Sequence, residues 1–118
     1  MKSRISSVFT IMGLMFAMLC LPASLHAQEA RGRITGTVTD STSASVPGAS
    51  VKIIDVARNT AITLTTNDDG LFQAPYLLLG TYQVVVEVAG FKKYVQDGVQ
   101  LQINETRDLT IVLEVGGA

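Results

Sequence analysis

Alternation of apolar and polar side chains is the main pattern of this chain from about residue 33 onward. The run Thr81–Val88 shows it well, with a tyrosine and three valines on one face and Gln83, Val85 and Glu87 on the other. A period of two residues is typical of a β-strand with one buried face. Seven segments are predicted as strands on this basis, and no helical period accompanies them: Arg33–Asp40, Ala49–Asp55, Ala61–Thr66, Leu71–Gln73, Thr81–Val88, Val99–Ile103 and Asp108–Val115.

Glycine and proline mark the predicted connections between these strands. Asp69-Gly70 and Asp97-Gly98 have the composition of tight turns, because glycine accepts the positive φ that such turns require. Pro75 is predicted to end the strand that contains Phe72, and Gly80 to form the next corner. The sequence leaves open whether Phe91–Val95 is a short eighth strand or an irregular edge.

Regularly spaced short strands with turn signals between them favour an all-β fold. We predict a seven-stranded antiparallel β-sandwich, in which each strand buries one apolar face against the facing sheet. Within it, Phe72 and Tyr82 are expected in the core, and Ile62 and Leu64 are expected to point inward.

The first 27 residues differ from the rest and are predicted to be a signal peptide, helical in its apolar part. Lys2 and Arg4 provide a positive start, Val8–Leu21 is uncharged, and small residues lead to a cleavage point after Ala27. The alternative is a membrane anchor, but an apolar run of about 14 residues is short against the roughly 20 that span a bilayer. The predicted domains are therefore residues 1–27, the leader, and residues 28–118, a single β-sandwich domain with no membrane insertion.

Removal of the leader takes away much of the chain's reactive chemistry. The single cysteine, Cys20, and the single histidine, His26, both lie within it. Zinc hydrolases and Ser-His-Asp enzymes need histidine, so neither device is available to residues 28–118, and no disulfide can form there. Seven basic and ten acidic residues remain, a net charge of about −3 that gives no footprint for nucleic acid or anionic lipid.

The acidic run Asn67-Asp68-Asp69-Gly70 has two interpretations. Clustered oxygen ligands could begin a calcium site, but the alternation and closing glutamate of an EF-hand loop are missing. Two adjacent aspartates are also not held across a cleft as a glycosidase requires. We favour a solvated turn, and predict no metal, no cofactor and no catalytic residue.

Aromatic side chains are the remaining candidates for a binding site. Sugar-binding surfaces use exposed aromatic platforms with polar neighbours. Residues 28–118 contain no tryptophan, and the aromatics not assigned to the core are Tyr76, Phe91 and Tyr94. These three are the candidate ligand-binding residues, with loop packing as the alternative. Lys92 and Lys93, beside Tyr94, would suit an acidic partner or a solvated edge that discourages strand pairing.

Three stretches of the chain, ITGTVTD, VPGASVKI and TTNDDGLFQAPYLLLGTYQVVVEVAGF, together resemble the carboxypeptidase regulatory-like domain. The most specific parts of this resemblance are Gly36-Thr-Val38, Pro47-Gly-Ala49, Asp69-Gly70 with Phe72, and Gly80-Thr-Tyr82 leading to Gly90-Phe91. The resemblance covers about Arg33–Val115, and the sequence is especially similar to the N-terminal domain of TonB-dependent outer-membrane receptors, where the domain lies between a signal peptide and a plug. It implies a transthyretin-like (prealbumin-type) sandwich, often grouped with carbohydrate-binding-like folds.

Taken together, these observations predict a non-catalytic, exported binding module. The resemblance implies a place in the periplasm or at the outer membrane, with an extracellular location as the alternative. The expected partner is a protein of the cell envelope, bound through loops and an open sheet edge by strand addition, or a polysaccharide. A carbohydrate-binding module and a structural spacer domain of a truncated receptor are the alternative functions.

Overall fold

The computed structural model describes residues 13, 15 and 31–116. The predicted leader, its cleavage point and residues 28–30 lie outside the described residues, apart from Gly13 and Met15, which are helical. Within the described part of the chain, no helix is both long and apolar enough to cross a membrane.

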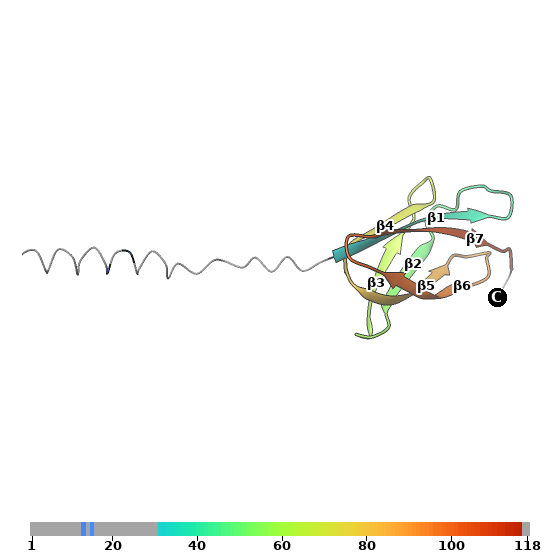
Figure 1. The fold of residues 1–118 in the computed structure, drawn as a ribbon. Coiled ribbons are helices and arrows are strands. Elements are labelled where there is room, and N and C mark those ends of the chain that lie inside the picture. Colours follow the sequence, from blue (N-terminus) through green and yellow to red (C-terminus); the bar gives the residue numbers. More distant parts are fainter. Residues whose placement is uncertain (1–12, 14, 16–30, 117–118) are drawn as a thin grey trace, which may run out of the picture.

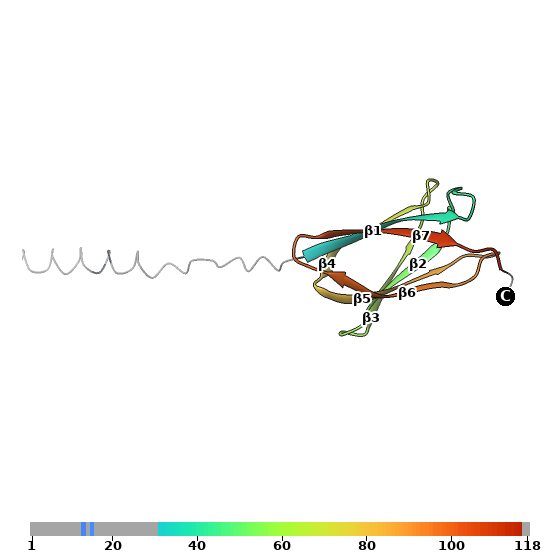
Figure 2. The ribbon, with the colours of Figure 1, turned by 45° about the vertical axis from the view of Figure 1, so that its right-hand side comes forward.

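Seven strands form two stacked sheets, which confirms the predicted sandwich (Figures 1 and 2). One sheet has three strands in the order β4-β1-β7, and the other has four in the order β3-β2-β5-β6. The strand bounds are β1 Arg31–Asp40, β2 Ser50–Asp55, β3 Thr60–Thr65, β4 Leu71–Leu78, β5 Gly80–Glu87, β6 Tyr94–Leu101 and β7 Thr106–Leu113.

The core lies between the sheets and is made by alternate residues of the strands. Phe72 and Tyr82 belong to it, as predicted. Removing apolar surface from water contributes about 25 cal/mol per Å², and this burial stabilises the paired sheets. The largest fully buried side chains are Ile34, Ile53, Ile111, Leu113, Val38, Val51, Val84, Val86 and Val99.

The small residue Gly36 and the polar residue Thr66 both fit closely into the packed interior. A Cβ at Gly36 would collide with the Phe72 ring and stand 3.2 Å from the Leu109 carbonyl oxygen, so the aromatic ring packs where a side chain would be. Thr66 is buried, and its Oγ1 donates to the Val46 carbonyl at 2.7 Å while accepting from the Ala49 amide at 2.9 Å. Thr66 therefore ties the loop before β2 to the end of β3.

One strand pair departs from the antiparallel expectation. β1 and β7 pair in parallel, from Arg33 opposite Thr106 to Asp40 opposite Leu113. Parallel neighbours need a long connection rather than a hairpin. The first and last strands of the domain satisfy this, because the whole chain between them is the connection.

The prediction that Pro75 ends its strand is wrong. β4 continues to Leu78, and its only neighbour is β1. Proline is tolerated there because an edge strand has one side without ladder hydrogen bonds. The pairing shifts between Gly32 opposite Leu77 and Ile34 opposite Ala74, so Pro75 and Tyr76 together stand opposite one residue of β1 as a bulge.

The prediction of a turn at Asp97-Gly98 is also wrong, because this dipeptide lies inside β6. A register shift opposite Gln83 accommodates Gly98 at φ +66°, and Gln83 donates a hydrogen bond to the Asp97 carboxylate. Glycine here serves a β-bulge rather than a reversal. Phe91–Val95 does not form a separate strand: its last two residues open β6, and Phe91 forms an isolated bridge with Val115.

Ile62 is on the inward side of its strand but is 41% exposed. It pairs with Ile53, which is buried, so both side chains occupy the same face. The four-stranded sheet is one strand wider than its partner, and β3 is its edge. The predicted inward orientation therefore does not bring full burial, because the facing sheet does not cover this strand.

Candidate functional site

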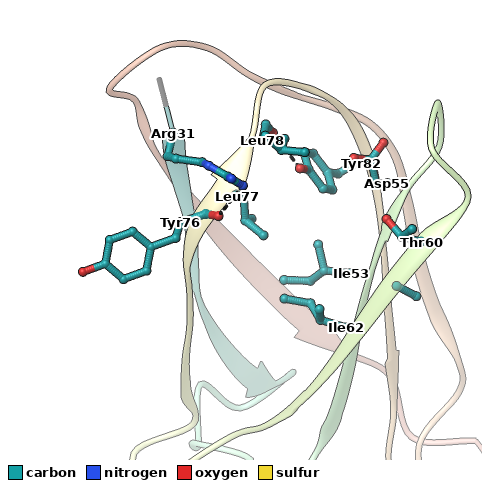
Figure 3. A pocket seen from close by; sticks show the side chains of 10 residues that line it. Arg31, Ile53, Asp55, Thr60, Ile62, Tyr76, Leu77, Leu78 and Tyr82 are labelled. Carbon is teal, nitrogen blue, oxygen red and sulfur yellow. Dashed lines mark hydrogen bonds between the residues drawn. The ribbon is translucent and has the colours of Figure 1, made fainter. Parts of the chain in front are cut away.

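A cleft of about 140 Å³ opens on the side of the sandwich where the edge strands β3 and β4 face each other (Figure 3). It lies at the end of the domain where β1 begins. Five strands contribute to it: Arg31 from β1, Ile53 and Asp55 from β2, Thr60, Ala61 and Ile62 from β3, Tyr76, Leu77 and Leu78 from β4, and Tyr82 from β5.

The floor of the cleft is apolar. Ile53 and Ile62 come from adjacent positions on paired strands, and Leu77 points toward them from β4 (Figure 3). The cleft exists because β3 extends past the narrower sheet, which leaves Ile62 partly uncovered. Ile53 is already buried, so an aliphatic or ring-shaped group of a partner would gain burial against Ile62 and Leu77.

Asp55 and Arg58 fix the polar wall at the end of β2. Asp55 is 5% exposed, and its carboxylate accepts from the Arg58 guanidinium at 2.9 Å and from the Arg58 amide at 3.2 Å. Burial acts to raise the Asp55 pKa, but these hydrogen bonds and the arginine charge outweigh it, so the pKa lies below the ordinary 3.8. Arg58 also donates to the Leu79 carbonyl at 3.2 Å, which clamps the β2–β3 turn against the β4–β5 corner.

The Tyr82 hydroxyl is committed to the fold. It donates to the Leu78 carbonyl at 2.6 Å. Burial, followed by the Asp55 charge, raises the pKa of Tyr82 above its ordinary value, so the phenol remains neutral. Tyr82 and Asp55 are thus positioning groups of the wall, and neither is arranged as a nucleophile with a base.

Tyr76 is the most exposed aromatic of the domain and has unusual backbone geometry. The residue is 79% exposed and its ring points away from the cleft in Figure 3, while its carbonyl accepts from the Arg31 guanidinium at 3.3 Å. Its φ is +59°, in the left-handed region that bulky residues rarely occupy. Such strain clusters at binding and active sites, which makes Tyr76 the strongest candidate for a contact residue.

Phe91 and Tyr94 lie at the opposite end of the sandwich, so the structure does not bring the three candidate aromatics together. Phe91 bridges to Val115 beyond the end of β7, whereas Tyr76 lies near the start of β1. Phe91 and Tyr94 are partly buried against the core, and the Tyr94 hydroxyl donates to the Gln96 side-chain oxygen at 3.0 Å.

The surface near Phe91 has its charges paired. Phe91 lines a second, shallow hollow of about 450 Å³ with Ser50, Glu87, Val88, Ala89 and Lys93. Lys93 lies 3.3 Å from Glu87, and Lys92 lies 3.6 Å from Glu114. Paired exposed lysines offer a partner little uncompensated charge, so this end is the weaker candidate.

The acidic run before β4 is a hydrogen-bonded turn. The Asn67 side-chain oxygen accepts from the Asp69 and Leu71 amides, both at 3.0 Å, and the Asn67 carbonyl accepts from the Gly70 amide at 2.9 Å. The Asn67 side-chain oxygen therefore stabilises the turn backbone. Across residues 31–116, no three His, Cys, Asp or Glu side chains group as a metal site would require.

No local pattern in the sequence indicated the other residues of the cleft or Arg58, which pairs with Asp55 beside it. Asp55 and Arg58 are three residues apart in a turn, a spacing that only hinted at an ion pair. Arg31 and Ile62 look like ordinary strand residues, and their role depends on which strands form the edges. That information is in the topology rather than in any local pattern.

Comparison with known families gives one clear match. The family model of the carboxypeptidase regulatory-like domain matches residues 33–114. A search of curated proteins gives no significant match.

Solved structures similar to this chain share its fold at low identity. The Bacillus anthracis TIE protein is 21% identical with a TM-score of 0.64, over 73% of this chain and 17% of that one. A putative carbohydrate binding protein from Bacteroides uniformis is 17% identical with a TM-score of 0.59, over 71% and 41%. A type II cohesin–X-dockerin complex from Acetivibrio cellulolyticus contains a chain that is 20% identical with a TM-score of 0.55, over 72% and 58%. This chain therefore matches only part of each of these proteins.

Proposed function

The chain belongs to the carboxypeptidase regulatory-like domain family, and we propose that it acts as an exported, non-catalytic interaction module of the bacterial cell envelope. Its partner would be a protein that contacts the side of the sandwich where β3, β4 and the cleft lie. The similarity to domains of larger binding assemblies, such as the cohesin–X-dockerin complex, supports a role in protein contacts.

The observation that carries this proposal is the exposed, left-handed Tyr76 at the rim of an apolar cleft. The bulge of Pro75 and Tyr76 sends the tyrosine ring outward and leaves Leu77 pointing into the cleft (Figure 3). A partner can therefore pack on the ring and insert an apolar side chain beside Leu77. Tyrosine offers a large contact area at a small cost in side-chain entropy, which is why it is enriched at interfaces.

The cellular context is part of the proposal. The leader pattern in residues 1–27 supports export, and the resemblance to N-terminal domains of TonB-dependent receptors supports the periplasm or outer membrane, with an extracellular location as the alternative. Mass spectrometry of the protein from the cell envelope tests this. A mature N-terminus at Gln28 is expected, and an uncleaved chain in the cytoplasm would contradict export.

Site-specific crosslinking tests the partner surface. A photo-reactive residue at position 76 is expected to capture a defined envelope protein, whereas the same residue at Thr110, exposed on β7 away from the cleft, is not. In a separate measurement, Tyr76→Ala should weaken binding of the purified partner without lowering the stability of the domain. Equal capture from positions 76 and 110, or none from 76, would contradict the proposed surface.

Carbohydrate binding is the second candidate function, favoured by the similarity to a putative carbohydrate binding protein. Tyr76 would provide the stacking platform at one end, and Phe91 and Tyr94 at the other. Their separation means that a single sugar cannot contact all three. Calorimetry with envelope and plant polysaccharides decides, since heat of binding lost in Tyr76→Ala would favour this function over protein contact.

A structural spacer within a longer receptor is the third candidate. In that case the domain would bind neither protein nor polysaccharide through the cleft. Reading the DNA that follows the codon for Ala118 tests this directly, because a continuing reading frame with plug and barrel segments would support the spacer.

A further inference from the structure

The four sheet edges of this sandwich differ in how they are guarded against pairing with another strand. Exposed edges are templates for strand addition, and native proteins block them with proline, bulges, charges or inward-pointing polar groups. The edge strands are β4 and β7 in one sheet and β3 and β6 in the other.

Three of these edges carry a blocking device. β4 contains Pro75 and the bulge at Tyr76. β6 contains the Gly98 bulge and the Asp97 charge. β7 carries adjacent charges at Arg107 and Asp108. Each device either removes a donor, bends the edge or introduces a charge that another strand would have to face.

β3 has none of them. Its six residues, TAITLT, contain no proline, no glycine and no charge, and its pairing with β2 runs from Ser50 opposite Thr65 to Asp55 opposite Thr60 without a shift. All its residues are exposed except Leu64, which is partly buried. A straight, uncharged strand rich in threonine and isoleucine has strong β-propensity and an unpaired row of backbone groups.

We propose that the β3 edge pairs with the β3 edge of a second copy of this chain, in antiparallel register about a two-fold axis at Thr63. This interface goes beyond the proposed partner surface, because it uses the backbone edge of β3 rather than the exposed ring of Tyr76. It would join the two four-stranded sheets into one continuous sheet across the dimer.

The sequence of β3 suits pairing with itself. A two-fold axis perpendicular to the sheet keeps inward side chains on the same face, so an axis at Thr63 sets Ile62 of one copy opposite Leu64 of the other. Both are apolar side chains of the inward face, and Ile62 is the one left 41% exposed. Side chains directly opposite each other interact most strongly across a strand pair, so like charges at these opposite positions would repel, whereas Ile62 and Leu64 attract.

Charges at the two ends of β3 complement each other in this register. Arg58 precedes the strand, and its side chain is 45% exposed while its partner Asp55 is buried, so a cation faces solvent at that end. Asp68 and Asp69 follow the strand and are exposed. Antiparallel pairing at Thr63 places the turn before β3 of one copy, which carries Arg58, at the same end of the interface as the Asn67–Gly70 turn after β3 of the other copy, so a basic turn and an acidic turn lie near each other at both ends of the joined strands. A parallel pairing would instead bring like charges together.

Cysteine crosslinking tests the register on residues 28–118, which contain all seven strands and the described core and have no cysteine. Opposite Cβ atoms of neighbouring antiparallel strands are about 4.5–5.5 Å apart, close to the separation a disulfide bridges. Thr63→Cys is expected to give a covalent dimer on mild oxidation. Thr110→Cys, an exposed threonine on the guarded edge strand β7, is the matched control and should remain monomeric.

Sedimentation across a concentration series provides the second measurement. The unmodified protein should pass from monomer to dimer, and Thr63→Lys should raise the dimer dissociation constant about fivefold or more, because two lysines meet at the axis. Thr110→Lys adds the same charge and should not change it. A protein that remains monomeric at the highest concentration, crosslinking of both cysteine variants alike, or a dimer lost in Thr110→Lys would each overturn the proposal. Failure of these tests leaves the cleft partner untouched, because Thr63 does not line the cleft.

Discussion

The left-handed conformation of Tyr76 leads to a prediction with an unusual sign. In an ordinary strand position, glycine is less stable than alanine by about 0.5–1 kcal/mol, because it loses more backbone freedom on folding. At φ +59° an L-residue with a Cβ carries a cost of about 1–2 kcal/mol that glycine does not. The difference between these terms favours glycine at position 76 by about 0.5–1 kcal/mol.

Comparing Tyr76→Gly with Tyr76→Ala isolates this difference. Both variants lose the same ring, from a residue that is 79% exposed and contributes little burial, so the loss of the ring cancels between them. The matched control is Gln73, an exposed residue of the same strand without a positive φ, where alanine should be the more stable replacement. The order of glycine and alanine is therefore expected to reverse between positions 73 and 76.

Urea unfolding followed by fluorescence or circular dichroism measures the effect. With a slope of about 1–3 kcal/mol per molar urea, Tyr76→Gly should unfold at a midpoint roughly 0.2–1 M above Tyr76→Ala. An equal or higher midpoint for Tyr76→Ala would refute the reasoning, since it would mean that the left-handed backbone costs nothing or is not kept. If the order holds, the chain carries a tyrosine where glycine would be more stable. Such a cost is expected at a residue retained for contact.

Three further predictions concern the stability of the fold. Thr66→Val should lower the free energy of unfolding by about 1–3 kcal/mol in urea titrations, because the buried Ala49 amide loses its hydrogen-bond acceptor. Gly36→Ala should lower the thermal midpoint, measured by calorimetry, because the added methyl group collides with the Phe72 ring. The folded-state pKa of Asp55 lies below its ordinary value, so stability that is present above pH 3.8 should be lost as the pH falls through and below that value. Asp55→Asn should reduce this loss in urea midpoints measured from about pH 6 to 3.

Alternation predicted the strands well because each strand has one face that must be buried. Val84 and Val86 are fully buried, and they follow the period of two that made their strand recognisable. Phe72 and Tyr82 occupy the core for the same reason. The connection between pattern and burial is direct at such positions, so no knowledge of neighbouring strands is needed.

The pattern failed where the place of a strand in its sheet decides the outcome. Pro75 breaks a central strand but is accommodated at the edge position of β4, and Gly98 serves a turn or a bulge depending on what pairs beside it. Ile62 has the right orientation, yet its burial depends on the width of the opposite sheet. Edge position is a property of topology, which local sequence does not state.

The candidate site was predictable only in part for the same reason. The exposure of Tyr76 follows from its place beside a proline and away from an apolar period. Its distance from Phe91 and Tyr94 depends on the topology, because the end of β4 and the β5–β6 connection lie at opposite ends of the sandwich. The Asp55–Arg58 pair and the uncovered Ile62 became part of a cleft only once β3 and β4 were known to be edges.

The dipeptide Pro75-Tyr76 links the stability of the fold to its surface. Proline at an open edge removes a donor, and the bulge that follows bends the strand, so β4 is a poor template for another strand. The same bulge turns the Tyr76 ring outward and leaves Leu77 facing Ile53 and Ile62 (Figure 3). A regular strand at this place would present an unbroken edge to another strand, and its side chains would alternate without the change of direction at Pro75-Tyr76. One local irregularity thus guards β4 against pairing and shapes the cleft beside it, which leaves β3 as the edge where a second chain can add.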